Sequence, residues 1–312
     1  MSDYSLDYAI SHDAEAQLCT VSFRCFDTPN SVSIQNAAGE NDANRVEDLL
    51  VQVRRMCLEL HRLWSFSLPN SDVSRINDAY AGCEVHDHTA CLIAAMKRFH
   101  ELEPSYDFTI GPVSYLWKHA ERVPAREALD EALSHVDANR IAVLGSSVNK
   151  ADPAMQVDVG GAAKGYAADL IASFLRQAGV SCAYVDLGGN LYMMGKHPEG
   201  RPWRVSVRIP DGVGVERIVL ELVDEAAVTS GSYERFVQIG DERYQHIIDA
   251  ATGYPSKSDV VSATVVSSSA LQADLLATTT CLLGSQGFES LAARWPSCRF
   301  VAITNDARVL RS

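Results

Sequence analysis

The chain lacks any long hydrophobic run, and its first 17 residues are polar and acidic. A membrane-spanning helix needs about 20 consecutive apolar residues, and a signal peptide needs a basic segment followed by an apolar one. We therefore expect no membrane anchor and a cytoplasmic location. Positive charge is also scarce, because 27 Lys and Arg residues stand against 40 Asp and Glu residues, for a net charge of −13. This balance argues against nucleic acid or anionic membrane as a partner.

Several common site motifs are absent as well. The sequence has neither the G-x-x-x-x-G-K-[ST] phosphate loop nor a G-x-G-x-x-G after the first strand, which disfavours a P-loop kinase and an ordinary Rossmann dehydrogenase. The eight cysteines contain no C-x-x-C pair and lie mostly in apolar runs, which indicates buried, reduced side chains. The sequence His86-Asp87-His88 precedes a helical pattern, so we interpret Asp87 or Thr89 as a helix cap instead of a metal ligand.

What is present is a mixed pattern of helices and strands without repeats. The chain has 312 residues, of which 47% are hydrophobic, enough for one large domain or two modest ones. Helical spacing predicts helices over 44–64, 89–102, 125–136, 162–178, 269–283 and 286–295, and the polar stretch 65–77 is expected to be a loop. Strands are expected at 18–23, 32–34, 182–187, 191–194, 203–209, 218–222, 236–239, 244–248, 260–266 and 299–303. Since no Pro-rich or charged linker divides the chain, we predict one α+β domain with two lobes that share a mixed or antiparallel sheet flanked by helices.

The segment 158–169, with the sequence DVGGAAKGYAAD, favours an anion-binding site. Its paired glycines let backbone approach a ligand closely, the start of the helix offers unpaired N–H groups, and Lys164 adds positive charge. A helix that merely packs closely on a strand would have the same pattern, so this alternative stays open.

Asp274 and Thr278 form a second candidate site. Their i, i+4 spacing on a helix places both side-chain oxygens on one face. Oxygen donors of this kind suit Mg²⁺, which completes its shell with water and phosphate oxygens. The alternative is an ordinary hydrogen-bonded pair on the helix surface.

The order of these motifs resembles the ApbE family, whose members are magnesium-dependent FAD:protein FMN transferases. The segments that carry the resemblance are 71–77, 106–112 with 116–117, 158–169, 185–190, 202–205, 229–236, 246–255 and 273–278. It extends from about residue 23 to residue 303. We therefore expect a single ApbE-like domain at 17–304, preceded by a polar extension at 1–16.

The resemblance implies a reaction in which FAD is split at its pyrophosphate and AMP leaves. The FMN phosphate then becomes esterified to a threonine or serine of a target protein, within a segment resembling Asp-Gly-x-Ser/Thr-Gly-Ala-Ser/Thr. Since no signal peptide is evident, the target is expected to be soluble. The metal ligands implied are the side chains of Asp274, which is also a catalytic residue, and Thr278, with the backbone carbonyl of Gly161.

The resemblance also implies contacts with FAD. The matching positions are Tyr106, Asp107, Asp158, Lys164 and Ile248, together with Phe26 and Thr28 at the first hairpin. Three positions depart from the family pattern. Phe26-Asp27-Thr28 stands where many relatives have Met-Gly-Thr, Ser67 replaces an aromatic residue, and Ala277 replaces a residue that can be acidic near the metal.

His246 is the candidate general base for the acceptor hydroxyl, since imidazole accepts protons near neutral pH. Alternatively, it is a buried, hydrogen-bonded histidine of a strand. Asp249 and Thr252-Gly253 are expected to form the turn that follows. Two other functions remain open: a magnesium-dependent FAD pyrophosphatase that yields FMN and AMP, and an FAD-binding protein without catalysis.

Overall fold

The computed structural model describes residues 7–35, 40–210, 215–233 and 236–312. Its largest element is a nine-stranded sheet with the order β1-β2-β3-β7-β8-β11-β14-β15-β16, in which all neighbouring strands are antiparallel. The strands are β1 (Tyr8–Asp13), β2 (Leu18–Cys25), β3 (Thr28–Gln35), β7 (Ala183–Leu187), β8 (Asn190–Met194), β11 (Glu225–Gly231), β14 (Val260–Ser267), β15 (Arg299–Thr304) and β16 (Val309–Arg311). The expected polar N-terminal extension thus contributes β1 to this sheet.

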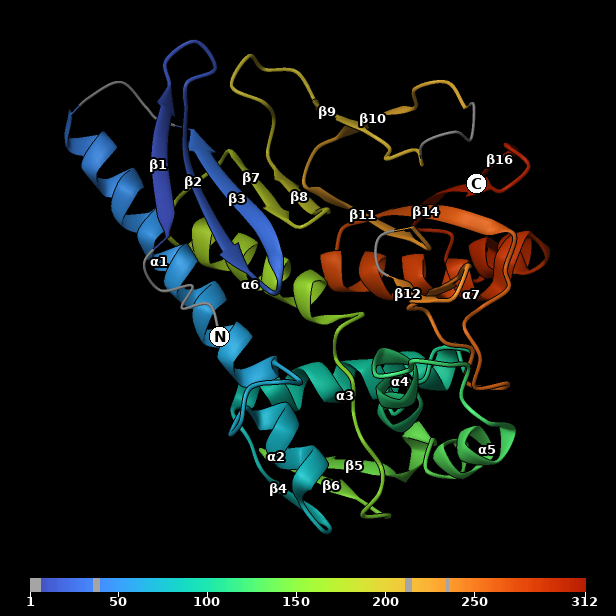
Figure 1. The fold of residues 1–312 in the computed structure, drawn as a ribbon. Helices are drawn as coiled ribbons and strands as arrows, with labels where there is room; N and C mark the ends of the chain where they lie inside the picture. Colours follow the sequence, from blue (N-terminus) through green and yellow to red (C-terminus); the bar gives the residue numbers. More distant parts are fainter. Residues whose placement is uncertain (1–6, 36–39, 211–214, 234–235) are drawn as a thin grey trace.

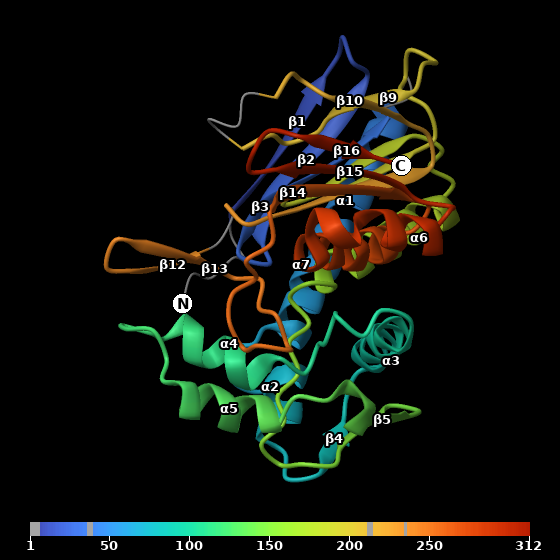
Figure 2. The same cartoon turned by 90° about the vertical axis from the view of Figure 1, so that its right-hand side faces the viewer.

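Three long helices cover one face of the sheet: α1 (Glu40–Trp64), α6 (Ala163–Gln177) and α7 (Ala270–Arg294) (Figures 1 and 2). The alternation of β2 places Cys19, Val21 and Phe23 in the main core against these helices. On the other face lies a separate ribbon of β9 (Trp203–Ser206) and β10 (Val219–Leu222). Its Trp203 and Leu222 form a second buried cluster with residues of the sheet.

The second lobe lies below the three helices in Figure 1 and has its own small sheet. It contains α2 (Asp72–Asp78), α3 (Asp87–Leu102), α4 (Gly111–Lys118), α5 (Arg126–Ser134), the 3₁₀ helix η1 (Ala138–Arg140) and the strands β4 (Gly82–Glu84), β5 (Ile141–Leu144) and β6 (Ser147–Lys150). These strands pair in the order β4-β6-β5. A hairpin of β12 (Phe236–Ile239) and β13 (Glu242–Gln245) projects beside α4 (Figure 2).

The end of α3 is joined to the end of α7 through Glu103, whose side chain is 2% exposed. Its Oε1 accepts hydrogen bonds from Arg294 Nε at 2.8 Å and from Trp295 Nε1 at 2.7 Å, while Oε2 accepts from Arg294 Nη2 at 2.6 Å. A buried carboxylate needs such partners. The contact therefore joins α3 of the lower lobe to the segment of α7 that follows Gly284.

The predicted α+β class is confirmed, but some elements differ from the sequence predictions. A loop is expected at 65–77, but its second half is wrong, because α2 begins at Asp72. Ser71 caps this helix, and its Oγ accepts a hydrogen bond from Ser74 N. The two helices expected at 269–283 and 286–295 are confirmed, because Gly284, with φ 68° and ψ −171°, is not helical and divides α7 into two segments. The cap of α3 is neither Asp87 nor Thr89 but His86, whose ring accepts from His88 N. The patterns also missed β1, β4, β5, β6, β11, β16 and α4.

Two further predictions can be compared with the structure. Among the described residues, no helix combines the length and apolar character needed to cross a membrane. Six of the eight cysteines are buried, as their places in apolar runs predict.

Candidate functional site

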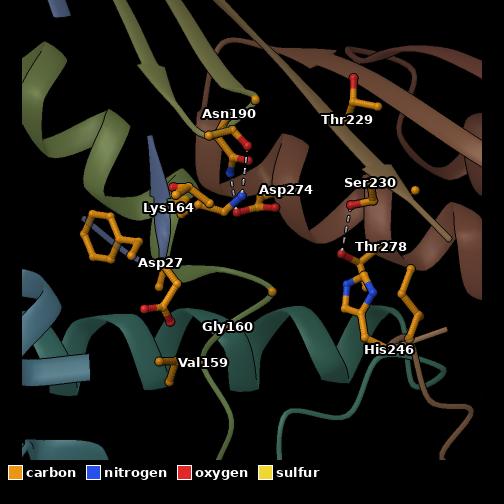
Figure 3. A pocket seen from close by; sticks show the side chains of 18 of the residues that line it. Asp27, Val159, Gly160, Lys164, Asn190, Thr229, Ser230, His246, Asp274 and Thr278 are labelled. Atoms are coloured by element: carbon orange, nitrogen blue, oxygen red, sulfur yellow. Dashed lines mark hydrogen bonds between the residues drawn. The ribbon is translucent and has the colours of Figure 1, made fainter. Parts of the chain in front are cut away.

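A cavity of about 1430 Å³ is lined by residues of both lobes (Figure 3). Its wall contains every site residue that the sequence predicted: Phe26, Thr28, Tyr106, Asp107, Asp158, Gly161, Lys164, His246, Ile248, Asp274 and Thr278. These residues come from segments more than 200 positions apart in the sequence, so it is the fold that assembles them. Small-molecule sites usually measure about 300–1,000 Å³, so this cavity has room for a dinucleotide and part of a second reactant.

Asp274 lies in the first turns of α7 and is only 4% exposed. Its Oδ2 accepts two hydrogen bonds, one from Asn190 Nδ2 at 2.5 Å and one from the backbone N–H of Gly165 at 3.0 Å (Figure 3). The second contact depends on a close crossing of α6 and α7, because a Cβ atom on Gly165 would lie 2.5 Å from the Ala270 carbonyl oxygen. The carboxylate is thus held in one orientation from two sides.

Thr278 lies one helical turn beyond Asp274, and its Oγ1 is 3.3 Å from Ser230 Oγ (Figure 3). Gly161 approaches the same place: a Cβ atom built on it would be 3.8 Å from Thr278 Oγ1 and 3.4 Å from the Tyr106 hydroxyl. The three positions proposed as metal ligands therefore lie at one end of α7, although the sequence separates Gly161 from the other two by more than 100 residues.

These oxygen donors fit a hard divalent cation. Burial raises the pKa of Tyr106 well above its usual value, and the nearby carboxylates of Asp274, Asp158 and Asp107 raise it further. These three carboxylates place negative charge around Tyr106, and a bound cation would offset that charge. Within the described ranges, no three His, Cys, Asp or Glu side chains gather as a metal site. One carboxylate, one hydroxyl and a carbonyl would suffice for Mg²⁺ only if water and substrate oxygens completed its shell.

Asp107 borders the cavity, but its carboxylate is hydrogen-bonded to Thr109 and Ala138. Its Oδ1 accepts from Thr109 N at 2.8 Å and Thr109 Oγ1 at 2.6 Å, and its Oδ2 accepts from Ala138 N at 3.1 Å. Asp158 Oδ1 similarly accepts from Gly160 N at 2.8 Å. Asp107 therefore fixes the loop after Tyr106, while Asp158 shapes the turn that leads to Gly161.

Phe26 and Asp27 form the two-residue turn between β2 and β3, with φ values of 52° and 60°. Left-handed backbone is rare for a bulky residue such as Phe, whereas Asp tolerates it. The Phe26 ring stacks on Trp64 at 6.4 Å between centroids and meets His61 edge-on at 5.9 Å. Thr28 packs against Gly188, where a Cβ atom would lie 2.5 Å from Thr28 Oγ1. This turn gives one end of the cavity an aromatic wall.

Lys164 and Ile248 contribute in different ways. Lys164 lies in the first turn of α6, and its Nζ donates to the Gly188 carbonyl at 3.4 Å, beside Asp274 in Figure 3. Ile248 is 9% exposed and packs with Val113, Trp117 and Leu129 in a small cluster of the lower lobe. The cavity thus has a cationic side near the glycine loop and an apolar side near α4.

His246 follows directly after β13 and is exposed at the cavity, close to Thr278 in Figure 3. The alternative of a buried strand histidine is therefore wrong. The turn expected after it is confirmed, since Asp249 Oδ1 accepts from Ala251 N at 2.9 Å and Asp249 Oδ2 from Thr252 Oγ1 at 3.0 Å. Trp117 Nε1 donates to the Gly253 carbonyl at 2.8 Å, which fastens this turn to the lower lobe.

The structure also shows the surroundings of two of the three positions that depart from the family pattern. Ser67 lines the cavity, whereas Ala277 is fully buried. Sequence reasoning gave no role to Asn190 or Ser230, although both lie in quoted segments, because their partners Asp274 and Thr278 are distant in sequence. In the segment 229–236, Glu234 and Arg235 lie outside the described residues.

Comparisons with known proteins agree with this geometry. The model of the ApbE family matches residues 26–301. A curated FAD:protein FMN transferase of Vibrio cholerae is 30% identical over 248 residues, which cover 76% of this chain and 74% of the relative. One of Rhodobacter capsulatus is 31% identical over 80% of this chain, but the match spans only 49% of that longer relative.

Solved structures of ApbE proteins are also similar to this chain. The flavin transferase ApbE of Vibrio cholerae superposes with a TM-score of 0.83 at 25% identity and covers 98% of this chain and 97% of its own. The ApbE protein of Thermotoga maritima has a TM-score of 0.79 at 27% identity, with the same coverage of 98% and 97%. Both likenesses extend over the two lobes that form the cavity.

Proposed function

The chain belongs to the ApbE family, and from this membership we propose that it transfers the FMN portion of FAD to a threonine or serine hydroxyl of an acceptor protein, with release of AMP and dependence on Mg²⁺. Its curated relatives are transferases, so the chain is an enzyme. The proposed chemistry is supported by one observation: a single cavity is lined by Asp274, Thr278, Gly161 and His246.

The glycine loop and the start of α6 would receive the pyrophosphate of FAD. At the start of α6, the N–H groups of Ala163 and Gly165 already donate to the Val159 carbonyl and to Asp274 Oδ2, so the anion would depend on the dipole of the helix and on Lys164. Lys164, in the first turn, adds a positive charge on the same side of the cavity. The aromatic wall of Phe26 and Trp64 suits the flavin ring. At the other side, Ile248 presents apolar surface to a ring of the nucleotide.

Asp274, Thr278 and the carbonyl of Gly161 would hold Mg²⁺. When bound, the cation supplies Lewis-acid stabilisation of charge on the phosphate oxygens. Asp274 contributes the formal negative charge, and its two hydrogen bonds keep the carboxylate fixed. Without a cation, the carboxylates that surround Tyr106 would repel a pyrophosphate. This repulsion is the physical reason for the proposed magnesium dependence.

His246 would accept the proton of the acceptor hydroxyl on a ring nitrogen. The hydroxyl oxygen forms a bond to the FMN phosphorus, the bond from that phosphorus to the bridging oxygen breaks, and AMP leaves with the bridging oxygen. His246 is exposed at the cavity, so a side chain of another protein can reach it. The proposed acceptor carries a segment similar to Asp-Gly-x-Ser/Thr-Gly-Ala-Ser/Thr.

The same exposure supports a second candidate function. Water can reach His246 when no acceptor is present, and attack by water would give free FMN and AMP. The residues needed are the same, so the two reactions differ only in the nucleophile. We infer that such FAD pyrophosphatase activity is a slow side reaction.

The test is to incubate the purified protein with FAD, Mg²⁺ and a domain that carries the acceptor segment, and to measure both AMP and the mass of the acceptor. We expect AMP together with an FMN-sized mass gain on one Ser or Thr. A control domain with that residue changed to Ala should gain no mass. AMP with free FMN and an unmodified acceptor would make the pyrophosphatase the main activity. Bound, intact FAD with two different acceptors would indicate a binding protein.

A further inference from the structure

Asn190 is the first residue of β8 and is 1% exposed. It follows the Gly188-Gly189 turn, with φ values of 61° and 92°, and pairs with Leu187 on β7 and Val228 on β11. Its side chain points toward Asp274, and the two groups are joined by the 2.5 Å hydrogen bond drawn in Figure 3. A carboxylate only accepts hydrogen bonds, so the NH₂ side of the amide must face it.

We propose that Asn190 is a positioning residue that orients Asp274 toward the cation, an inference that rests on the proposed function. Both N–H donors, Asn190 Nδ2 and Gly165 N, approach the same oxygen, Oδ2. Lone pairs occupied by these donors are not available to a metal. The pair therefore fixes the orientation in which the carboxylate would meet Mg²⁺.

A neutral amide at position 190 suits this role better than a charged side chain would. A carboxylate at position 190 would repel Asp274 at this short distance, and a lysine would neutralise it and compete with the metal. The neutral amide orients Asp274 and leaves its full negative charge for the cation. Groups that hydrogen-bond to metal ligands typically change metal affinity or activity by about 10–100-fold when they are removed.

The position of Asn190 suits this role because its strand is paired on both sides. Asn190 lies in the middle of the nine-stranded sheet, where β8 pairs with β7 on one side and β11 on the other. Asp274 approaches from α7 on the helical layer, and Gly165 from α6. Donors from two separate elements, β8 and α6, thus fix the carboxylate that α7 carries, which reduces the reorganisation needed when a cation binds.

The experiment compares Asn190→Leu, which removes the hydrogen bond at similar volume, with Asn190→Ser, which is smaller and keeps a hydroxyl. The probe is Mg²⁺ alone, titrated into the full-length protein by calorimetry, with Mn²⁺ and electron paramagnetic resonance as a second readout. Thr264→Val is the matched control, because it removes a partly buried hydrogen bond to Thr229 at 2.8 Å in the same sheet without touching Asp274.

We expect both Asn190 variants to bind Mg²⁺ about 10–100-fold more weakly, while Thr264→Val binds it as the wild type does. High Mg²⁺ should restore most of the turnover of Asn190→Ser, which a purely structural defect would not allow. Wild-type Mg²⁺ affinity in a folded Asn190 variant would overturn the inference. Asp274→Ala separates the two hypotheses: if that variant retains wild-type affinity, the proposed metal site itself is wrong.

Discussion

The backbone of Gly165 passes so close to that of Ala270 that a Cβ atom on Gly165 would lie 2.5 Å from the Ala270 carbonyl oxygen and 2.8 Å from Leu271 Cα. This contact sets the distance between α6, which carries Lys164, and α7, which carries Asp274 and Thr278. The two halves of the candidate site are therefore held together by a residue that contributes no side chain.

Gly165→Ala should consequently damage both stability and the site. The added methyl group meets backbone that cannot move aside, so we expect the free energy of unfolding to fall by about 1–3 kcal/mol. We also expect weaker Mg²⁺ binding, because separating the helices lengthens the bond from Gly165 N to Asp274. Urea unfolding and Mg²⁺ titration measure the two effects. Gly145→Ala, which strains the β5–β6 turn with φ 61° but meets no atom within 4 Å, should lower stability alone.

Removal of the charge at Asp274 should abolish most of the turnover. A bound cation supplies several kcal/mol of stabilisation in reactions of this class, so Asp274→Asn should lower AMP release at least about 100-fold. FAD binding, followed by fluorescence, should persist because the aromatic wall and Ile248 are unchanged. Turnover within a few-fold of the wild type would contradict the assignment of this carboxylate.

The Thr278 hydroxyl has a matched control on the same helix. Thr278→Val and Thr279→Val are both isosteric, but Thr279 is buried and donates to the Leu275 carbonyl at 2.8 Å. We expect Thr278→Val to raise the Mg²⁺ concentration needed for half-maximal activity. Thr279→Val should reduce stability without this shift. Equal behaviour of the two variants would exclude a metal-binding role for Thr278.

Loss of the His246 imidazole should slow transfer without affecting the binding of FAD or Mg²⁺. A positioned general base contributes about 10²–10⁴-fold, and His246→Gln should lose a factor in that range in the single-turnover rate. The control is His119→Gln, since His119 lies at the end of α4 against Tyr115. A His246→Gln rate close to that of the wild type would show that another group, or water, accepts the proton.

Local patterns in the sequence predict some parts of this site and miss others. The i, i+4 spacing of Asp274 and Thr278 does put both on one face of α7, because helical geometry is local. The meeting of this pair with Gly161 depends on the crossing of α6 and α7, and only the resemblance to a family indicated it. Asp107 could be placed at the cavity, but the direction of its carboxylate depends on Thr109 and Ala138.

The elements missed by the patterns share a physical reason. The α2 helix is only seven residues long, and helices this short depend on tertiary packing more than on propensity. Its Ser71 cap and the burial of Val73 and Ile76 stabilise it. Strand β11 has Glu, Ala, Ser or Gly at five of its seven positions, so only Val228 and Thr229 give it a β-branched signal. It is a strand because β8 and β14 pair with it from both sides.

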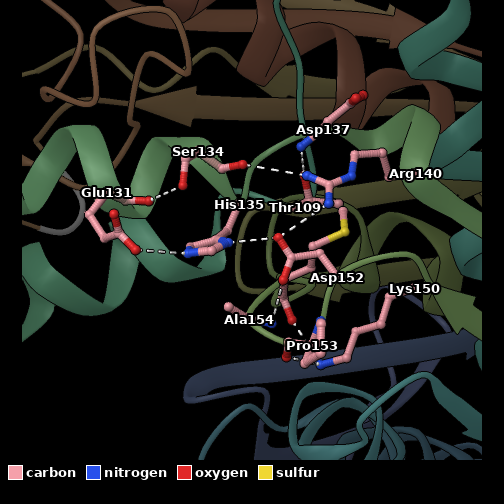
Figure 4. A network of polar contacts seen from close by, with 11 residues as sticks. Thr109, Glu131, Ser134, His135, Asp137, Arg140, Lys150, Asp152, Pro153 and Ala154 are labelled. Atoms are coloured by element: carbon pink, nitrogen blue, oxygen red, sulfur yellow. Dashed lines mark hydrogen bonds and ion pairs between the residues drawn. The ribbon is translucent and has the colours of Figure 1, made fainter.

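A polar network in the lower lobe joins His135, Asp152, Glu131 and Arg140, and we expect it to make stability depend on pH (Figure 4). His135 Nδ1 lies 2.7 Å from Asp152 Oδ2, His135 Nε2 lies 3.4 Å from Glu131 Oε1, and Arg140 Nη2 donates to Asp152 Oδ2 at 3.2 Å. The hydrogen bond to Asp152 raises the pKa of His135 above 6.5. The same bond, with one from Ala154 N, lowers the pKa of Asp152 below 3.8.

The signs of these shifts define where the pair stabilises the fold. A raised histidine pKa stabilises the folded state below pH 6.5, and this contribution disappears as the pH rises through the folded pKa. A lowered aspartate pKa stabilises it above pH 3.8, and this contribution disappears as the pH falls through the folded pKa. The contribution is therefore complete between about pH 4 and pH 6.5.

We expect His135→Gln to lower the free energy of unfolding by less than about 1 kcal/mol at pH 6, since solvent screens the pair, and by clearly less at pH 9. Urea unfolding of the wild type, His135→Gln, Asp152→Asn and the double variant at both pH values gives the coupling energy. Arg140 and Ala154 N also bind Asp152, so only the coupling reports the His135–Asp152 contact. A coupling energy that is unchanged at pH 9 would mean that the contact does not depend on the charge of His135.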